Sequence, residues 1–301
     1  MRKQLCDALV ARASQSDMVF LTGDLGFMAL EALQSVLGER FINAGVAEQN
    51  MISVAAALAR EGLDVWAYSI APFCYARPFE QIRNDIAFHR LPVHLIGNGG
   101  GYGYGVMGPT HHAIEDYGVL LTLPNMRVYV PVFDGDVASV IVKAGRDTQA
   151  TYLRLGKGEA PEGYTVPEYA AWRLLVVGNG APVIAVGPLA GTYIEALARL
   201  PDNQRPNLWA LSEMPLAFNP PPSELIQQIV GSGRVYVAEE HVAQGSFAAS
   251  LAMHMLEHGI VAKMFHLCAR AHHYSNFGSN AYLRVNSGLD PQSLLSAIAI
   301  G

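Results

Sequence analysis

The strongest constraint on the fold of this chain is an alternation of short apolar runs with segments of helical periodicity. The helix-period segments cover residues 46–60, 76–89 and 134–146. The apolar runs are rich in β-branched and aromatic residues, which is typical of buried strands, and they lie at 18–22, 64–68, 92–97, 126–131 and 150–155. Strands separated by helices form βαβ units, so this part of the chain is predicted to build a parallel sheet covered on both faces.

A second, smaller alternation follows a stretch rich in Gly, Pro and Glu, within which residues 161–178 are predicted to be a linker. Beyond it, predicted strands at 182–187, 207–212, 234–241 and 261–267 alternate with predicted helices after Ala190, over 222–230 and over 246–258. A length of 301 residues favours two domains, because single cores usually stop growing before that size. The predicted fold class is α/β, with two domains (1–160 and 179–301) of parallel-rich sheets flanked by helices.

The low charge content indicates a surface that a partner covers. Charged residues make up 15% of the chain, against about 25% in an average domain, and the mean hydropathy is +0.20. A partner subunit over part of the surface explains this composition, and a large monomeric core is the alternative. A net charge of −6 gives no electrostatic footprint for nucleic acid. No apolar run approaches the roughly 18 residues that a membrane span requires.

The cysteine pattern predicts structural thiols. Cys6, Cys74 and Cys268 are odd in number and widely separated, and they form no CxxC or metal-ligand spacing. The first residues carry two cations but no apolar segment of the kind found in signal peptides. These features predict a cytoplasmic location and no metal ligands on this chain.

Glu48 is the first candidate for chemistry. It lies in a predicted helix, and at about 100° per residue it shares one face with Met51, Ala55 and Leu58. An acid on such an apolar stripe must be paired or protonated, because an unpaired buried charge is very costly. The alternative is a glutamate in the first turn that faces solvent and interacts with the helix dipole.

A glycine-rich segment supplies the second candidate. Seven glycines lie between Gly97 and Gly108 directly after a predicted strand, which lets the backbone approach a ligand closely. The GxGxxG match at 103–108 is not read as a dinucleotide site, because Pro109 follows it and no acidic residue stands about twenty positions further on. His111 and His112 end the segment where polar groups converge on ligands in open α/β sheets, although a flexible loop is the alternative.

Aromatic residues gather at 68–86. Tyr68, Phe73, Tyr75 and Phe79 lie near a predicted strand end, with Arg77 among them. An aromatic wall beside a buried acid would suit a flat heteroaromatic cofactor. Ordinary core packing remains the alternative for each aromatic residue taken alone.

These segments together resemble the C-terminal half of transketolases and 1-deoxyxylulose-5-phosphate synthases, and above all split transketolase-like proteins. The resemblance covers essentially the whole chain. It rests on TGDLGF (22–27), INAGVAEQNM (42–51), YSIAPF (68–73), FEQIRNDI (79–86), GPTHHAIED (108–116), LPNMRVYVP (123–131) and VAEEH (237–241). AGVAEQN joined to GPTHH at this separation is a specific combination.

The resemblance implies thiamine diphosphate as cofactor and a role for several residues. Glu48 matches the catalytic glutamate that bonds the aminopyrimidine ring and promotes formation of the nucleophilic ylide. Phe73 and Ile70 would line the pyrimidine pocket, with Asp24 nearby.

The same resemblance implies the substrate contacts. His111 matches the histidine that contacts the substrate around the reacting carbonyl, and His112 and Arg77 are placed with the substrate too. Arg154 matches an arginine that grips a substrate phosphate.

One family feature is missing. The family holds the diphosphate and its divalent metal through a GDG followed by asparagine-like ligands, and this sequence contains no such segment. The resemblance therefore implies that an N-terminal diphosphate-binding subunit carries Mg²⁺ or a similar ion. The active site would form between the two chains in an α₂β₂-like heterotetramer with a homodimeric contact.

Departures from the family bear on the substrate. Val106 and Met107 stand where transketolases often carry Glu-Asp, and these side chains form no hydrogen bonds with a sugar hydroxyl. The histidine that helps to bind a sugar phosphate aligns near Gly99, and Ile70 stands where phenylalanine is frequent. Arg154 keeps a phosphorylated donor possible, but the sequence predicts a modified sugar or a less polar acceptor.

Three functions follow as hypotheses. The main one is transfer of a two-carbon ketol unit from a ketose to an aldehyde in a specialised sugar or secondary-metabolite pathway. The second is decarboxylation of a 2-oxo acid with acyl transfer, as in 1-deoxyxylulose-phosphate synthases or the beta chains of pyruvate dehydrogenases. The third is a non-catalytic regulatory subunit, against which the presence of Glu48 and both histidines speaks.

Overall fold

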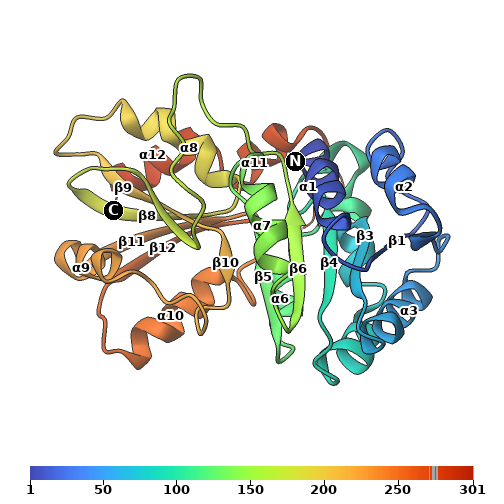
Figure 1. Cartoon of the computed structure of the whole chain (residues 1–301). Helices are drawn as coiled ribbons and strands as arrows, with labels where there is room; N and C mark the ends of the chain where they lie inside the picture. Colours follow the sequence, from blue (N-terminus) through green and yellow to red (C-terminus); the bar gives the residue numbers. More distant parts are fainter. Residues whose placement is uncertain (271, 273–274, 276, 301) are drawn as a thin grey trace.

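The chain folds into two α/β units that lie side by side, each built around its own sheet (Figure 1). The computed structural model describes residues 1–270, 272, 275 and 277–300. Both sheets are rich in parallel strands and flanked by helices, which confirms the predicted fold class.

The first sheet has seven strands in the order β10-β5-β6-β4-β3-β1-β2. All its pairings are parallel except that of β10 with β5. The central strands β1, β4 and β6 are buried at every residue, as strands covered on both faces must be. The strands are β1 (Met18–Thr22), β2 (Phe41–Asn43), β3 (Asp64–Ile70), β4 (Val93–Asn98), β5 (Met126–Tyr129), β6 (Ala150–Leu155) and β10 (Glu213–Met214).

Helices cover both faces of this sheet. One face packs against α1 (Arg2–Ala13), α2 (Glu31–Leu37) and α7 (Asp136–Ala144) around the buried side chains of Phe20 and Trp66. The other face packs against α3 (Glu48–Arg60), α4 (Ala71–Tyr75), α5 (Phe79–Gln81), the π-helix η2 (Ile82–Ala87) and α6 (Asp116–Leu120). Three short 3₁₀ turns complete this unit: η1 (Gly38–Arg40), η3 (Gly105–Met107) and η4 (Pro109–His111).

The second sheet has five strands in the order β12-β11-β8-β9-β7, with only β7 antiparallel to its neighbour. Its strands are β7 (Trp172–Val176), β8 (Gly180–Val186), β9 (Pro206–Leu211), β11 (Arg234–Glu239) and β12 (Lys263–Cys268). Its helices are α8 (Leu189–Ala198), α9 (Ser223–Ser232), α10 (Phe247–Glu257), α11 (Asn280–Ser287) and α12 (Pro291–Ile300).

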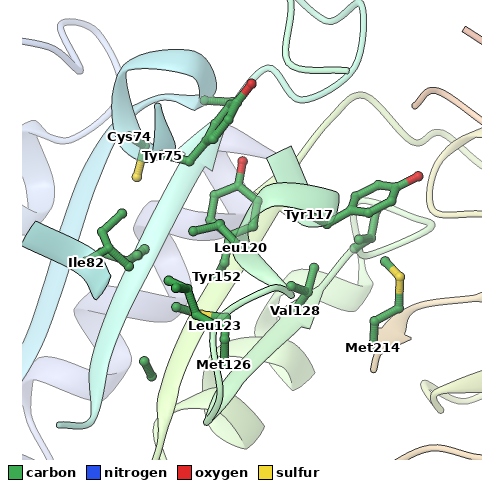
Figure 2. Close-up of a cluster of buried hydrophobic side chains, with 14 of the residues drawn as sticks. Cys74, Tyr75, Ile82, Tyr117, Leu120, Leu123, Met126, Val128, Tyr152 and Met214 are labelled. Carbon is green, nitrogen blue, oxygen red and sulfur yellow. The ribbon is translucent and has the colours of Figure 1, made fainter. Parts of the chain in front are cut away.

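The two units share one core. The short strand β10 follows β9 in the chain but adds to the edge of the first sheet beside β5. Its Met214 lies in the same buried cluster as Tyr117, Val128 and Tyr152 of the first unit (Figure 2). The apolar side chains of the first sheet therefore continue without a break into those of the second.

The helix predicted over 76–89 is wrong in its bounds. The structure instead has α4 from Ala71, a break at 76–78, then α5 and the π-helix η2. Pro78 has no N–H to donate and restricts Arg77 before it, so a continuous helix cannot pass this point.

The predicted linker also needs correction, because β7 lies inside the range 161–178. Trp172 and Leu174 alternate along an edge strand that pairs with β9, while the Gly- and Pro-rich composition ends before them. The connecting segment is therefore shorter than predicted. None of the helices in the described ranges is long and apolar enough to cross a membrane.

Candidate active site

Glu48 is buried, as the helical stripe predicted. It is the first residue of α3, it is only 4% exposed, and Met51 and Ala55 on the same face lie in the core. The alternative of a glutamate facing solvent is therefore wrong. The positive end of the helix dipole favours a carboxylate at this position.

A clamp of hydrogen bonds sets where α3 begins. The Asn43 side-chain oxygen accepts from the backbone N–H of Asp24 and of Gly45, each at 3.0 Å. The Asn43 amide also donates to Asp24 Oδ1 at 3.0 Å. Gly45 has φ +70, a conformation that a glycine adopts without strain. Asp24 thus holds the loop that presents Glu48, and its own side chain is exposed at the rim.

Arg77 is the charge partner of Glu48. Its Nη1 donates to Glu48 Oε1 at 2.7 Å, and its guanidinium lies 3.9 Å from the centre of the Phe73 ring. The Arg77 side chain is 45% exposed, so solvent weakens this pair. Behind it, burial first and the charge of Glu48 second raise the pKa of the Cys74 thiol to about 12. Cys74 is therefore a neutral core thiol.

Ring contacts link further residues to this pair. The Phe73 ring meets the His111 ring edge-on with centres 5.2 Å apart, and the centre of the Tyr104 ring lies 6.3 Å from that of His111. The Asn98 side-chain amide donates to the Tyr104 hydroxyl at 2.6 Å. We call this series, from Glu48 through Arg77, Phe73, His111 and Tyr104 to Asn98, the site wall.

The topology explains why the site wall forms. Phe73 follows the carboxyl end of β3, Asn98 ends β4, and Glu48 follows β2, all in one parallel sheet. Carboxyl ends of parallel strands meet at the same edge, which is where open α/β sheets bind ligands. An open depression lined by Val46, Ala47, Gln49 and Asn50 exposes the Glu48–Arg77 end of the wall.

His112 does not join the site wall. It follows η4 in extended backbone. It is 2% exposed and packs edge-on against Tyr102, with the ring of His272 stacked 6.1 Å away. The structure therefore places His112 in the packing between the two units, and its contact with the substrate stays a prediction.

Arg154 is also held inside the protein. Its Nε lies 3.1 Å from Asp116 Oδ2, and its Nη2 donates to the backbone oxygens of Ala113 and Glu240 at 2.8 and 2.7 Å. The side chain is 5% exposed. Two of its nitrogens thus bind the protein itself, and the residue also lines a cavity with Lys157 and Arg284. Its grip on a substrate phosphate stays a prediction.

Ile70 lies beside the site wall. It is half-buried at the end of β3, directly before α4, on the same edge of the sheet as Phe73.

Glu115 links the first unit to the second. It accepts a hydrogen bond from Tyr75 Oη at 3.0 Å and pairs with His272 of the second unit. Burial of Glu115 opposes ionisation, but the hydrogen bonds with His272 and Tyr75 and the charges of His272 and His241 together outweigh it and lower the pKa of the carboxyl.

The sequence interpretation missed Asn98 and Tyr104. Asn98 is a polar residue at the end of a buried strand, and that position was the available signal. Within the described ranges, no group of three or more His, Cys, Asp or Glu side chains could hold a metal ion.

A parallel sheet with a buried acid at a helix start and an aromatic wall beside it defines a class of cofactor-binding α/β protein. Residues 2–162 match the family described as "Transketolase, pyrimidine binding domain". The chain belongs to this family.

Full-length relatives agree with the motif-based resemblance to split transketolases. The chain is 29% identical over 256 residues to an apulose-4-phosphate transketolase subunit of Phocaeicola vulgatus, covering 82% of this chain and 81% of that one. It is 25% identical over 265 residues to "1-deoxy-D-xylulose-5-phosphate synthase" of Desulfotalea psychrophila, covering 86% of this chain but 41% of that one.

A solved structure matches both units. "Split gene transketolase, inactive beta4 tetramer" superposes with a TM-score of 0.83 at 26% identity, covering 99% of this chain and 96% of that chain. The recognition of a split, C-terminal transketolase-like subunit is thereby confirmed.

Proposed function

We propose that this chain is the pyrimidine-binding subunit of a thiamine-diphosphate-dependent transketolase that moves a two-carbon ketol unit from a ketose to an aldehyde, in a specialised sugar or secondary-metabolite pathway. The observation that carries the proposal is the buried Glu48 at the start of α3, which opens onto a depression and heads an aromatic wall. The family membership of the chain supports the cofactor.

The residues present fit the aminopyrimidine part of that cofactor. Glu48 would hold the proton at a ring nitrogen, and Phe73 with Ile70 would lie along the flat ring. Because water reaches Glu48 poorly, its carboxyl can hold or release that proton with little competition from solvent. When bound, thiamine diphosphate supplies a group that stabilises the carbanion of the ketol unit.

His111 would meet the substrate. Its ring is half-buried and contacts those of Phe73 and Tyr104, and the hydroxyl of Thr110 lies 3.0 Å from Nδ1. That contact fixes the ring and directs Nε2 to an oxygen near the reacting carbonyl. Arg77 would orient Glu48 and lie at the edge of the same space.

A separate N-terminal subunit would complete the site, in an α₂β₂ arrangement, and would hold the diphosphate with Mg²⁺ or a similar ion. Apolar residues at the rim support this, since Phe27, Met28 and Val46 are 76%, 96% and 74% exposed. The similar structure whose title calls it an inactive beta4 tetramer also supports a requirement for the partner.

The second candidate is decarboxylation of a 2-oxo acid followed by acyl transfer. Its support is the 25% identity to a 1-deoxy-D-xylulose-5-phosphate synthase over most of this chain. Against a non-catalytic subunit, Glu48, Phe73 and His111 lie together through Arg77 as a catalytic site needs.

Calorimetry on two samples tests the proposal. Thiamine diphosphate with Mg²⁺ is titrated into the isolated chain and into the complex purified through a tag on this chain. We expect binding only to the complex, together with ketol transfer from a ketose and no carbon dioxide release from pyruvate. Tight binding to the isolated chain would contradict the need for a partner, and turnover of pyruvate in place of a ketose would favour the second candidate.

A further inference from the structure

The far end of the site wall is built around one tyrosine. Tyr104 adjoins His111, which in turn adjoins Phe73, so it is placed to meet a part of the substrate other than the group that His111 contacts. Its ring is half-buried, and its hydroxyl is anchored by the Asn98 amide at 2.6 Å.

Gly99 leaves the space that the Tyr104 ring fills. Gly99 has φ +76, and a Cβ built there would come within 2.1 Å of Tyr104 Cδ2. Gly103 is equally constrained, since its Cβ would lie 2.8 Å from the Gly99 Cα. The Tyr104 ring therefore leaves no room for a side chain at position 99. A basic side chain at position 99 is excluded, and the phenol of Tyr104 occupies its space.

The same loop covers the nearest cation. A Cβ on Gly100 would lie 2.4 Å from Arg154 Nε, so the loop backbone packs directly on the guanidinium. The cavity that Arg154 does line, of about 170 Å³, lies toward the second unit with Lys157 and Arg284. Of the described residues that line this cavity, none belongs to the site wall.

We propose that Tyr104 is a specificity-determining residue that selects an acceptor ending in an uncharged hydroxyl rather than in a phosphate. This inference rests on the proposed function. Asn98 donates to the phenol oxygen, which leaves the phenol proton to donate to a substrate hydroxyl. A phosphate at this point would be desolvated beside an aromatic ring, and the guanidinium of the site wall, that of Arg77, is already paired with Glu48, so its burial is unfavourable.

The neighbouring surface agrees with this selection. Val106 and Met107 of η3 follow Tyr104 and are 64% and 57% exposed, so an apolar rim borders the same end. The proposed preference for an unphosphorylated substrate distinguishes this chain from the apulose-4-phosphate transketolase subunit, which is 29% identical and whose name specifies a phosphorylated sugar.

The test compares an aldose with its own phosphate ester in the purified complex. Hydroxypyruvate serves as ketol donor, and erythrose or erythrose 4-phosphate as acceptor. We expect a higher kcat/KM for erythrose. Tyr104→Phe removes one hydrogen bond and should raise KM for erythrose by about tenfold with kcat unchanged. Tyr282→Phe, a half-exposed tyrosine on α11, is the matched control and should change nothing.

A preference of the wild-type complex for erythrose 4-phosphate, or an unchanged KM in Tyr104→Phe, would overturn the inference. Hydroxypyruvate consumption without an acceptor is measured in parallel, through release of carbon dioxide. If the complex consumes the donor and Tyr104→Phe leaves the acceptor KM unchanged, only this inference fails. If it consumes no donor, the proposed function fails and the inference with it.

Discussion

The ion pair between Arg173 and Asp136 offers a quantitative test of how the two units are joined. Arg173 on β7 binds Asp136 at the start of α7 through both terminal nitrogens of its guanidinium. Nη1 donates to Oδ1 at 2.8 Å, and Nη2 donates to Oδ2 at 2.5 Å. Both side chains are at most 5% exposed. Oδ2 also accepts from the backbone N–H of Val132 at 3.0 Å and of Phe133 at 2.9 Å.

Arg173→Met should lower the free energy of unfolding by about 3 kcal/mol. Loss of one partner of a buried pair typically costs about 3–5 kcal/mol, because the remaining charge stays desolvated. We take the lower end because the two backbone N–H groups and the start of α7 still stabilise the Asp136 carboxylate. Urea unfolding followed by circular dichroism measures the change.

A surface pair provides the control. Arg199 and Glu195 on α8 also form an ion pair, at 3.0 Å, but their side chains are 79% and 59% exposed. Arg199→Met should therefore change stability by less than about 0.5 kcal/mol. A loss below about 1 kcal/mol for Arg173→Met, or equal losses for both variants, would refute the claim that the buried pair joins the units.

Three further predictions concern single positions. Gly118→Ala should lower the unfolding free energy by about 1–3 kcal/mol, because a Cβ on Gly118 of the first unit would lie 2.7 Å from the backbone oxygen of Gly245 of the second. Gly231→Ala, where the added Cβ would meet open space, is the control in the same urea assay. Burial lowers the pKa of His266, but hydrogen bonds with Cys268 and Glu239 outweigh it and raise that pKa to about 9. Its stabilising effect should be complete below the unfolded pKa of about 6.5 and be lost as the pH rises through about 9, so the stability difference between wild type and His266→Gln should shrink over that range; a constant difference would contradict the assignment. Arg77→Gln keeps an amide that can donate to the buried Glu48 carboxylate, and Arg77 itself is half-exposed, so the substitution should cost less than about 1 kcal/mol of stability. A larger loss in urea unfolding would show that the Glu48 carboxylate depends on the charge of Arg77.

The strands were the most predictable part of the fold. The apolar runs at 18–22 and 150–155 coincide with β1 and β6, because both strands are buried on both faces and are therefore mostly apolar. The helix over 76–89 failed because Pro78 interrupts a helical pattern that continues on both sides of it. β7 was hidden because a single short edge strand follows a Gly- and Pro-rich segment.

The site was predictable only where one helix or one strand end decided the geometry. The burial of Glu48 followed from its place on the α3 stripe. His111 contacts Phe73 whereas His112 packs against Tyr102, and this separation depends on a turn that ends between them, which spacing alone does not specify. Arg154 is covered by the backbone of the glycine-rich loop and by Glu240 of the second unit. These contacts join distant parts of the chain, so no local sequence pattern encodes them.

The role of Glu48 is the central claim, and one substitution tests it most directly. Glu48→Gln keeps the shape of the side chain and its burial but removes the carboxyl that can take up or release a proton. Ketol transfer by the purified complex should fall by about 10²–10⁴-fold while the complex still assembles, and Glu39→Gln at an exposed position should retain full activity. Wild-type turnover in a Glu48→Gln complex would contradict the account.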